Sequence, residues 1–197
     1  HEEVTIETML LPQRYGTAAA PLPFVWQPVG QTPKYSLLPL VLGTLKVTIL
    51  AMLFAAPLGV LAAIFTAEFA PRWLKEIIKP VIELLAGIPS VVLGFFALIA
   101  LATFVQDVLK LDYRLNAINA GIALGLAVVP VIYTICEDAL NAVPKAYRNA
   151  SLALGATPWQ TAWQVVLPAA MPGVFAACVL GFGRAMGETM IVLMASG

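Results

Sequence analysis

An arginine and a glutamate stand four residues apart within an otherwise apolar stretch near the end of the sequence. The stretch from Gly183 to Thr189 reads GRAMGET, and apolar residues flank it on both sides. Burying one charged side chain at the centre of a bilayer costs about 2.5–3.5 kcal/mol, so two in a single span require an explanation. Because residues four apart share a helix face, Arg184 and Glu188 are predicted to pair.

Two explanations of this pair stay open. The first is structural: the ion pair sets the register of the helix against its neighbours and never meets a substrate. The second is functional: Arg184 lines an aqueous path for an oxyanion, because a guanidinium presents a planar fork of donors that matches phosphate or sulfate oxygens. In that case Glu188 holds the arginine between transport cycles, and the hydroxyls of Thr189 and Ser90 add neutral donors.

A polar interval, residues 137–168, precedes this stretch, and its punctuation predicts two short helices joined by a tight corner. Pro144 suits the first turn of one helix, and Gly155 suits the left-handed residue that closes it. Residues 157–160 read TPWQ, which predicts a capping box at the start of the second helix, and we expect Pro168 to end that helix. The interval is either an amphipathic hairpin on the lipid headgroups or a structure presented to a cytosolic partner.

Composition places these segments in a membrane. Hydrophobic residues make up 60% of the 197 residues and charged residues 11%, with a mean hydropathy of +0.89, whereas charged residues are about a quarter of a soluble domain. The net charge of zero gives no reason to expect nucleic acid as a partner. We predict an all-α fold, a polytopic membrane helical bundle. Its spans are expected at about 37–67, 81–105, 117–136 and 173–197.

The remaining features frame these spans. Residues 1–36 are rich in proline, and we expect them to form an extramembrane, periplasmic segment or a linker. The chain starts at His1 and stops at Gly197 inside an apolar run, so we expect a piece of a longer polypeptide, truncated at its C-terminus. With residues 137–168 in the cytosol, basic residues on that side slightly outnumber those on the other. The two cysteines have no metal-ligand spacing.

Three stretches resemble permease subunits of ABC transporters. Gly155 and Leu167-Pro168 stand at the spacing of the EAA signature of these permeases. The three letters that name the signature fall on Asn149-Ala150-Ser151, so asparagine stands where the family has glutamate. AGIPS at 86–90 and GRAMGET at 183–189 are similar to PstC-type permease subunits of phosphate importers and to their PstA-type partners.

This resemblance implies a fold and a set of partners. The fold is that of type I ABC importer permeases, the MetI-like kind, in a multi-pass protein of the bacterial inner membrane. The partners are a second, PstA-like permease subunit, a PstB-like dimer that binds and hydrolyses ATP, a periplasmic phosphate-binding protein, phosphate and membrane lipid. The chain itself is expected to be no enzyme and to hold no cofactor, and its sequence contains no Walker A loop.

The resemblance also implies roles for particular residues. Arg184 and Glu188 take part in phosphate passage, and residues 137–168, the coupling segment, dock into a cleft of the ATPase. Motion of residues 149–160 is expected to pass to the third and fourth spans, which flank them. The residues that carry the docking are Asn149, Ala150, Ser151, Gly155, Ala156, Leu167 and Pro168. Two alternatives remain: the same architecture importing another oxyanion such as sulfate or molybdate, or a membrane scaffold for phosphate signalling.

Overall fold

The chain forms two compact units, His1–Lys46 and Val47–Gly197. The first unit contains a two-residue antiparallel pair, in which β1 (Trp26–Gln27) is bonded to β2 (Lys34–Tyr35). The predicted periplasmic segment, residues 1–36, lies mostly outside the described part of the chain and stays a prediction. The computed structural model describes residues 9–10, 24, 26–27 and 34–196.

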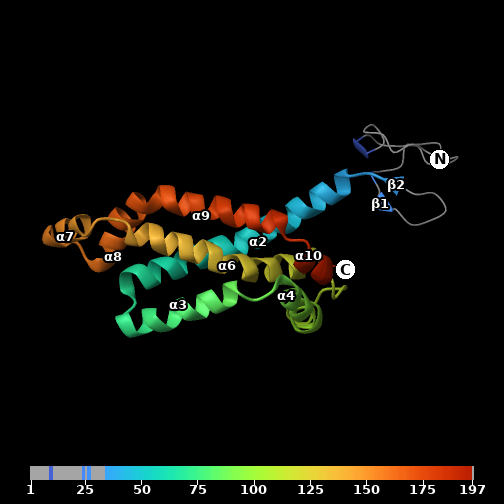
Figure 1. The fold of residues 1–197 in the computed structure, drawn as a ribbon, viewed down its shortest axis with the longest axis horizontal. Coiled ribbons are helices and arrows are strands. Elements are labelled where there is room, and N and C mark those ends of the chain that lie inside the picture. Colours follow the sequence, from blue (N-terminus) through green and yellow to red (C-terminus); the bar gives the residue numbers. More distant parts are fainter. Residues whose placement is uncertain (1–8, 11–23, 25, 28–33, 197) are drawn as a thin grey trace. The chain divides into compact units, whose positions relative to one another are not determined.

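Helices make up almost all of the described residues, as the sequence predicted (Figure 1). Four of the described helical segments are long and apolar enough to cross a membrane: Leu38–Phe69, Ser90–Leu109, Ala117–Asn141 and Pro158–Gly187. The individual elements are α2 (Leu38–Ile64), the π turn η1 (Phe65–Phe69), α3 (Arg72–Ala86), α4 (Ser90–Phe96), the π turn η2 (Ala97–Leu101), α5 (Ala102–Leu109), α6 (Ala117–Asn141), α7 (Lys145–Ala153), α8 (Pro158–Thr161), the π turn η3 (Ala162–Val166), α9 (Leu167–Gly187) and α10 (Met190–Ser196).

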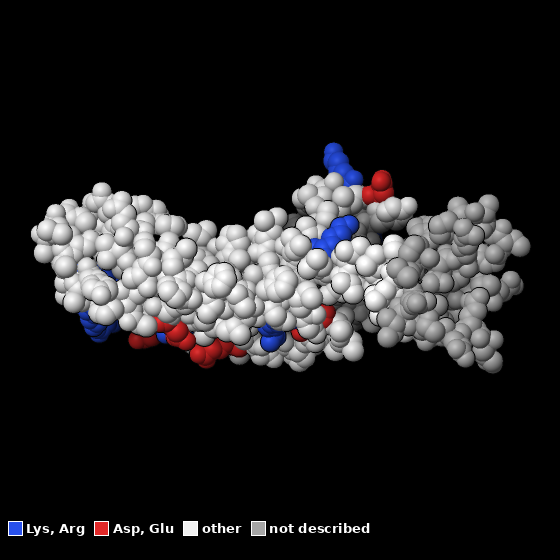
Figure 2. Space-filling model, turned by 90° about the horizontal axis from the view of Figure 1, so that it is seen from above, with Lys and Arg blue, Asp and Glu red and all other residues white. Residues whose placement is uncertain are grey.

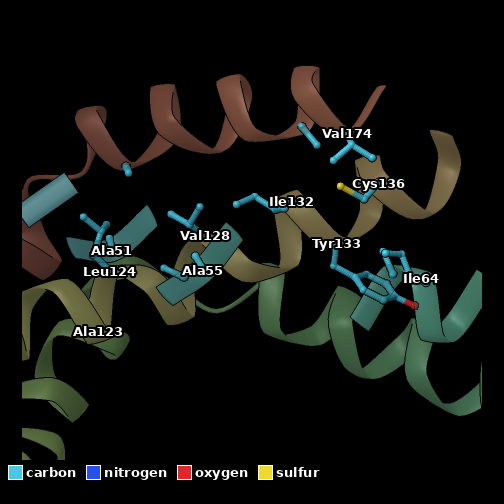
Figure 3. Close-up of a cluster of buried hydrophobic side chains, with 14 of the residues drawn as sticks. Ala51, Ala55, Ile64, Ala123, Leu124, Val128, Ile132, Tyr133, Cys136 and Val174 are labelled. Carbon is cyan, nitrogen blue, oxygen red and sulfur yellow. The ribbon is translucent and has the colours of Figure 1, made fainter. Parts of the chain in front are cut away.

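Helix α6 is the centre of the second unit. Within its most apolar window 61% of the residues are buried, against 39%, 22% and 28% for the other three candidate spans. Figure 3 shows its apolar side chains reaching toward α2 on one side and α9 on the other, with Leu124, Val128 and Ile132 fully buried. A helix that buries its surface on several sides must be apolar on those sides, and α6 contains apolar or small residues along most of its length.

Small residues let α2 and α9 approach this central helix closely. A Cβ built on Gly121 would lie 2.8 Å from the Cβ of Leu50, and one on Gly125 would lie 2.9 Å from a ring carbon of Phe54. The GxxxG pair therefore packs α6 against α2 within one chain rather than forming a dimer face. Helices α2 and α6 run parallel, because the residue numbers in the two contacts, Leu50 with Gly121 and Phe54 with Gly125, rise together.

A break at residues 87–89 divides the second predicted span. We predicted one span over 81–105, whereas α3 ends at Ala86 and a separate helix begins at Ser90. Proline has no N–H and disfavours helical backbone in the residue before it, so Pro89 stops α3. The apolar segment long enough to span a membrane is consequently Ser90–Leu109.

The prediction that Pro168 ends its helix is wrong. Helices α8, η3 and α9 form one segment from Pro158 to Gly187, and Pro168 lies in the first turn of α9. The backbone N–H of Leu167 donates to the carbonyl of Ala162, five residues back, so the hydrogen-bond ladder is shifted by one residue directly before the proline. We attribute the continuation to this π turn, which lets the helix pass a residue that lacks an N–H.

We expect Gly173→Ala to destabilise the second unit. The Cβ of an alanine at 173 would collide with the Cβ of Ala139, where α9 crosses α6. Overpacking of this kind costs about 1–3 kcal/mol, which should appear as a lower Tm of the purified protein in detergent. Gly43→Ala is the matched control, because a Cβ there meets nothing within 4 Å. Equal Tm values for the two variants would contradict the close crossing.

Candidate functional site

The coupling segment forms two short helices with a tight corner, as predicted. Gly155 has φ of +87°, the left-handed conformation that glycine adopts without strain, and it follows the end of α7. At the start of α8 the backbone N–H of Gln160 donates to the Thr157 hydroxyl at 3.2 Å, and the Thr157 N–H donates to the Gln160 side chain at 2.9 Å. This is the predicted capping box, and it fixes the direction in which α8 leaves the corner.

The corner presents apolar side chains outward. Leu154 is 90% exposed and Trp159 is 60% exposed. Figure 1 shows α7 and α8 together at one end of the second unit, beyond the ends of α6 and α9. An exposed apolar tip of this kind, on a rigid pair of helices, is typical of a surface that a protein partner covers.

The predicted docking residues divide between the tip and the helix behind it. Asn149, Ala150 and Gly155 are exposed, while Ser151 and Ala156 are half-buried. Ser151 and Thr161 share a hydrogen bond of 2.9 Å between their hydroxyls, which joins α7 to α8. The other two predicted docking residues, Leu167 and Pro168, lie further along in α9.

Two ion pairs tie this end of the second unit together, and the sequence revealed neither. Arg148 of α7 binds Glu68 of η1 at 2.7 Å. Lys79 of α3 binds the buried carboxylate of Glu137 in α6 at 3.0 Å, and this hydrogen bond raises the pKa of Lys79. Each pair joins residues 58 or more positions apart (137 − 79 = 58; 148 − 68 = 80), so no local pattern could have indicated them.

The predicted pair of Arg184 with Glu188 is not formed. Helix α9 ends at Gly187, and Glu188 has extended backbone angles, φ −80° and ψ 118°. Residues four apart share a face only while the helix continues through both of them. In the described part of the chain the guanidinium of Arg184 is exposed and has no ion pair or hydrogen bond.

The contacts between α9 and α6 give the position of Arg184 along the bundle. Gly181 packs against Val128 and Ile132, near the middle of α6, and Gly173 packs against Ala139 near its C-terminal end. Helices α9 and α6 are therefore antiparallel, and Arg184, one turn beyond Gly181, is level with the middle of α6. The arginine is an exposed cation about halfway through the bundle.

The helix break beside Arg184 redirects the chain into α10, which two helices hold. A Cβ on Gly94 of α4 would lie 3.0 Å from the sulfur of Met194, so the two helices are close. Buried Asn119 of α6 donates to the carbonyl of Ala195 at 2.9 Å. Ser90 is the first residue of α4, and Thr189 directly precedes α10. Among the described residues, neither side chain is hydrogen-bonded to Arg184. Among the described residues, no hydrogen bond or ion pair joins the side chains of the four predicted pathway residues, and their common role stays a prediction.

The rest of the described surface offers little chemistry. No group of three or more His, Cys, Asp or Glu side chains in the described residues is arranged to hold a metal ion. Uncharged residues cover most of the face drawn in Figure 2, and several of the charged groups on that face lie along its lower edge. A groove between α2 and α9 is lined by apolar residues and the Cys178 thiol, so it contains no donor set for an anion.

Comparisons with known proteins agree on one family. Residues 55–196 match the family described as "Binding-protein-dependent transport system inner membrane component". The chain is 45% identical over 172 residues to the "Probable ABC transporter permease protein YqgH" of Bacillus subtilis (87% of this chain, 56% of that protein). It is 34% identical over 191 residues to the "Phosphate transport system permease protein PstC" of Xylella fastidiosa (87% and 58%) and 38% identical over 192 residues to "PstC 1" of Mycobacterium tuberculosis (88% and 56%).

A solved structure has the same fold. The chain superposes with a TM-score of 0.60 on a structure titled "Inward facing conformations of the MetNI methionine ABC transporter", at 22% sequence identity, over 77% of this chain and 68% of that one. The chain spans a little more than half of the length of the curated relatives it matches, 56–58% for the three named above.

Proposed function

The chain belongs to the family of binding-protein-dependent transport system inner membrane components, and from that premise we propose that it is a permease subunit of an ATP-driven importer of inorganic phosphate. The family and the structural match confirm the predicted fold, an all-α membrane bundle of the MetI-like kind, in a multi-pass inner membrane protein. Relatives named as phosphate transport permeases, 34% and 38% identical, support phosphate as the transported ion.

The observation that carries the proposal is the exposed Arg184 at the level of the middle of α6. A cation at that depth is costly against lipid, so the face that holds it must meet water, an anion or another protein chain. A second permease subunit across this face would enclose a path, and the guanidinium would supply two parallel donors to a phosphate oxygen pair. The adjacent break between α9 and α10 supports this assignment, since discontinuous helices form the substrate sites of many transporters.

The other pathway residues have smaller roles in this proposal. Thr189 and Ser90 supply neutral hydroxyl donors near the helix starts, which hold an anion without adding charge. Glu188 stands at the break and balances the charge of Arg184 when no anion is present. A binding site that kept a full positive charge in a low-dielectric surrounding would retain the anion too tightly for release.

Energy for transport comes, in this proposal, from a separate ATPase that receives the tip of the coupling segment. The exposed side chain of Leu154 and the left-handed turn at Gly155 form the tip of the coupling segment, at the corner between α7 and α8. Closure of the ATPase around ATP would move this tip as a rigid body. The movement would shift the populations of inward-open and outward-open states, because each state exposes Arg184 to one side of the membrane.

Reconstitution tests the proposal. We expect vesicles that hold both permease chains, the ATPase and the binding protein to accumulate labelled phosphate only when ATP is supplied, with little competition from excess sulfate. Sulfate has a similar charge but no proton with which to donate a hydrogen bond, so a hydrogen-bond acceptor, expected largely in the binding protein, distinguishes the two anions. Equal competition by sulfate or molybdate would identify another oxyanion as the cargo. ATP hydrolysis with no uptake of any oxyanion would favour the scaffold role instead.

A further inference from the structure

The strongest set of side-chain contacts in the described residues surrounds Arg148. Its Nη2 donates to Glu68 Oε1 at 2.7 Å, and its Nε lies 3.2 Å from both carboxylate oxygens of the same glutamate. Its Nη1 donates to the carbonyl of Val143 at 2.6 Å, and Nη2 also donates to the carbonyl of Leu140 at 2.8 Å. All three guanidinium nitrogens are therefore engaged, by two other segments of the chain, η1 and the end of α6.

Two of these contacts are to backbone carbonyls at the C-terminal end of α6. Leu140 is in the last turn of α6, where its carbonyl also accepts from the backbone N–H of Val143 at 3.3 Å, and Val143 follows just beyond the helix. A cation at a helix C-terminus also interacts favourably with the helix dipole. The Arg148 and Glu68 side chains are only 20% and 11% exposed, so the pair is not the solvated kind that contributes almost nothing.

The π turn η1 is held at two further points by neighbouring elements. The ring of Phe69 lies 5.6 Å from the ring of Trp159 in α8, centroid to centroid. The Nζ of Lys75 in α3 donates to the carbonyl of Ala67 at 2.9 Å. Consecutive residues of η1 thus contact α3, α7 and α8, which makes this turn the place where the coupling segment meets the end of α2.

We propose that Arg148 is a positioning residue that clamps α7 to both the end of α6 and η1, so that a movement of the tip is delivered to α2 and α6 together. This inference rests on the proposed function for its consequence, transport, and on the contacts above for its geometry. The sequence predicted transmission to the third and fourth spans, α6 and α9, which adjoin the tip along the chain. The clamp adds α2, the first span, through a contact 80 positions away in sequence.

Three features make the joint stiff enough for this role. A guanidinium bonded at every nitrogen cannot rotate without breaking a charge-assisted hydrogen bond. The two carbonyl groups that accept from Arg148 belong to the backbone at the end of α6, so they move only when α6 moves. Beyond this set of contacts, α2 packs so closely against α6 at Gly121 and Gly125 that neither helix can slide along the other without a clash. A displaced α7 therefore carries two spans with it.

Neutral substitutions on either side of the joint test the proposal in the assembled transporter. Arg148→Gln and Glu68→Gln each remove one charge and leave its buried partner unpaired, and we expect phosphate taken up per ATP hydrolysed to fall by about tenfold. Arg72→Gln and Glu76→Gln are matched controls at exposed positions of α3 without a side-chain partner among the described residues. We expect both controls to stay within about twofold of the parent.

A distance measurement separates positioning from loss of fold and from failure of the proposed function. Spin labels at Ala153 of α7 and Phe65 of η1, both exposed, report the joint directly in a chain whose two cysteines are replaced by alanine. We expect one narrow distance, unchanged by ATP, in that parent and a broad, ATP-dependent distance in Arg148→Gln. If the glutamine variant does not insert, Arg148→Lys replaces it, because lysine keeps the charge without the fork.

Either of two results would overturn the clamp: a narrow, nucleotide-independent distance in the Arg148 variant, or unchanged uptake per ATP in both glutamine variants. Failure of the parent complex to move phosphate has a different meaning. In that case the proposed function fails, while the distance measurement still decides whether Arg148 holds α7 to η1.

Discussion

Arg184→Gln is expected to lower ATP-driven phosphate uptake by about 10-fold or more, because it removes at least one charge-assisted hydrogen bond to the anion, each contributing about 1.5–3 kcal/mol. Glutamine is shorter and donates only from one amide nitrogen, so it has no charge and no second nitrogen to supply a parallel donor. The protein should insert and assemble normally, since Arg184 is exposed and bonded to no other described residue. Initial uptake into vesicles at saturating binding protein is the measurement.

Two further measurements show whether the loss of uptake arises from the lost guanidinium: uptake by Arg184→Lys, and ATP hydrolysis by both variants. Arg184→Lys keeps the charge and should retain more uptake than the glutamine variant, since a lysine binds phosphate as a point charge. ATP hydrolysis should persist in both, because the coupling segment lies at the other end of α9 (Figure 1). Unchanged phosphate uptake by Arg184→Gln, with ATP hydrolysis still coupled to it, would show that the arginine has a structural role and that the pathway lies elsewhere.

Gly155→Val is expected to separate ATP hydrolysis from transport. Position 155 has φ of +87°, and a side chain with a Cβ in left-handed backbone costs about 1–2 kcal/mol, more for a β-branched residue. A Cβ there would meet no atom within 4 Å, so the cost arises from the backbone and the corner must change its shape to relieve it. We expect uptake per ATP to fall by about tenfold while ATP hydrolysis and membrane insertion continue.

Gly155→Asn is the matched control at the same position. Asparagine tolerates left-handed backbone far better than valine does, because its short polar side chain bonds locally. The asparagine variant should therefore keep most of its coupled uptake, although it is as bulky as valine at the tip. If the two variants transport equally well, the left-handed turn does not set the docking geometry. If both fail, the tip requires a residue with no side chain at all.

Local chemistry in the sequence determined several features of this protein. The left-handed Gly155, the capping box at Thr157 and the helix break before Ser90 each depend on a residue type and its immediate neighbours. Such features are decided by the φ of glycine, the missing N–H of proline and a side chain within reach of its own backbone. Long apolar runs likewise predicted an all-α membrane bundle, because lipid leaves few other ways to pair backbone groups.

Tertiary structure alone decided three others. Pro168 continues a helix because a π turn precedes it, Arg184 has no helical partner because the chain turns at Glu188, and Arg148 binds Glu68 from 80 positions away. Each outcome depends on which helices pack together and at what level. The packing arrangement depends on many contacts along α6, so no short stretch of sequence is enough to predict it.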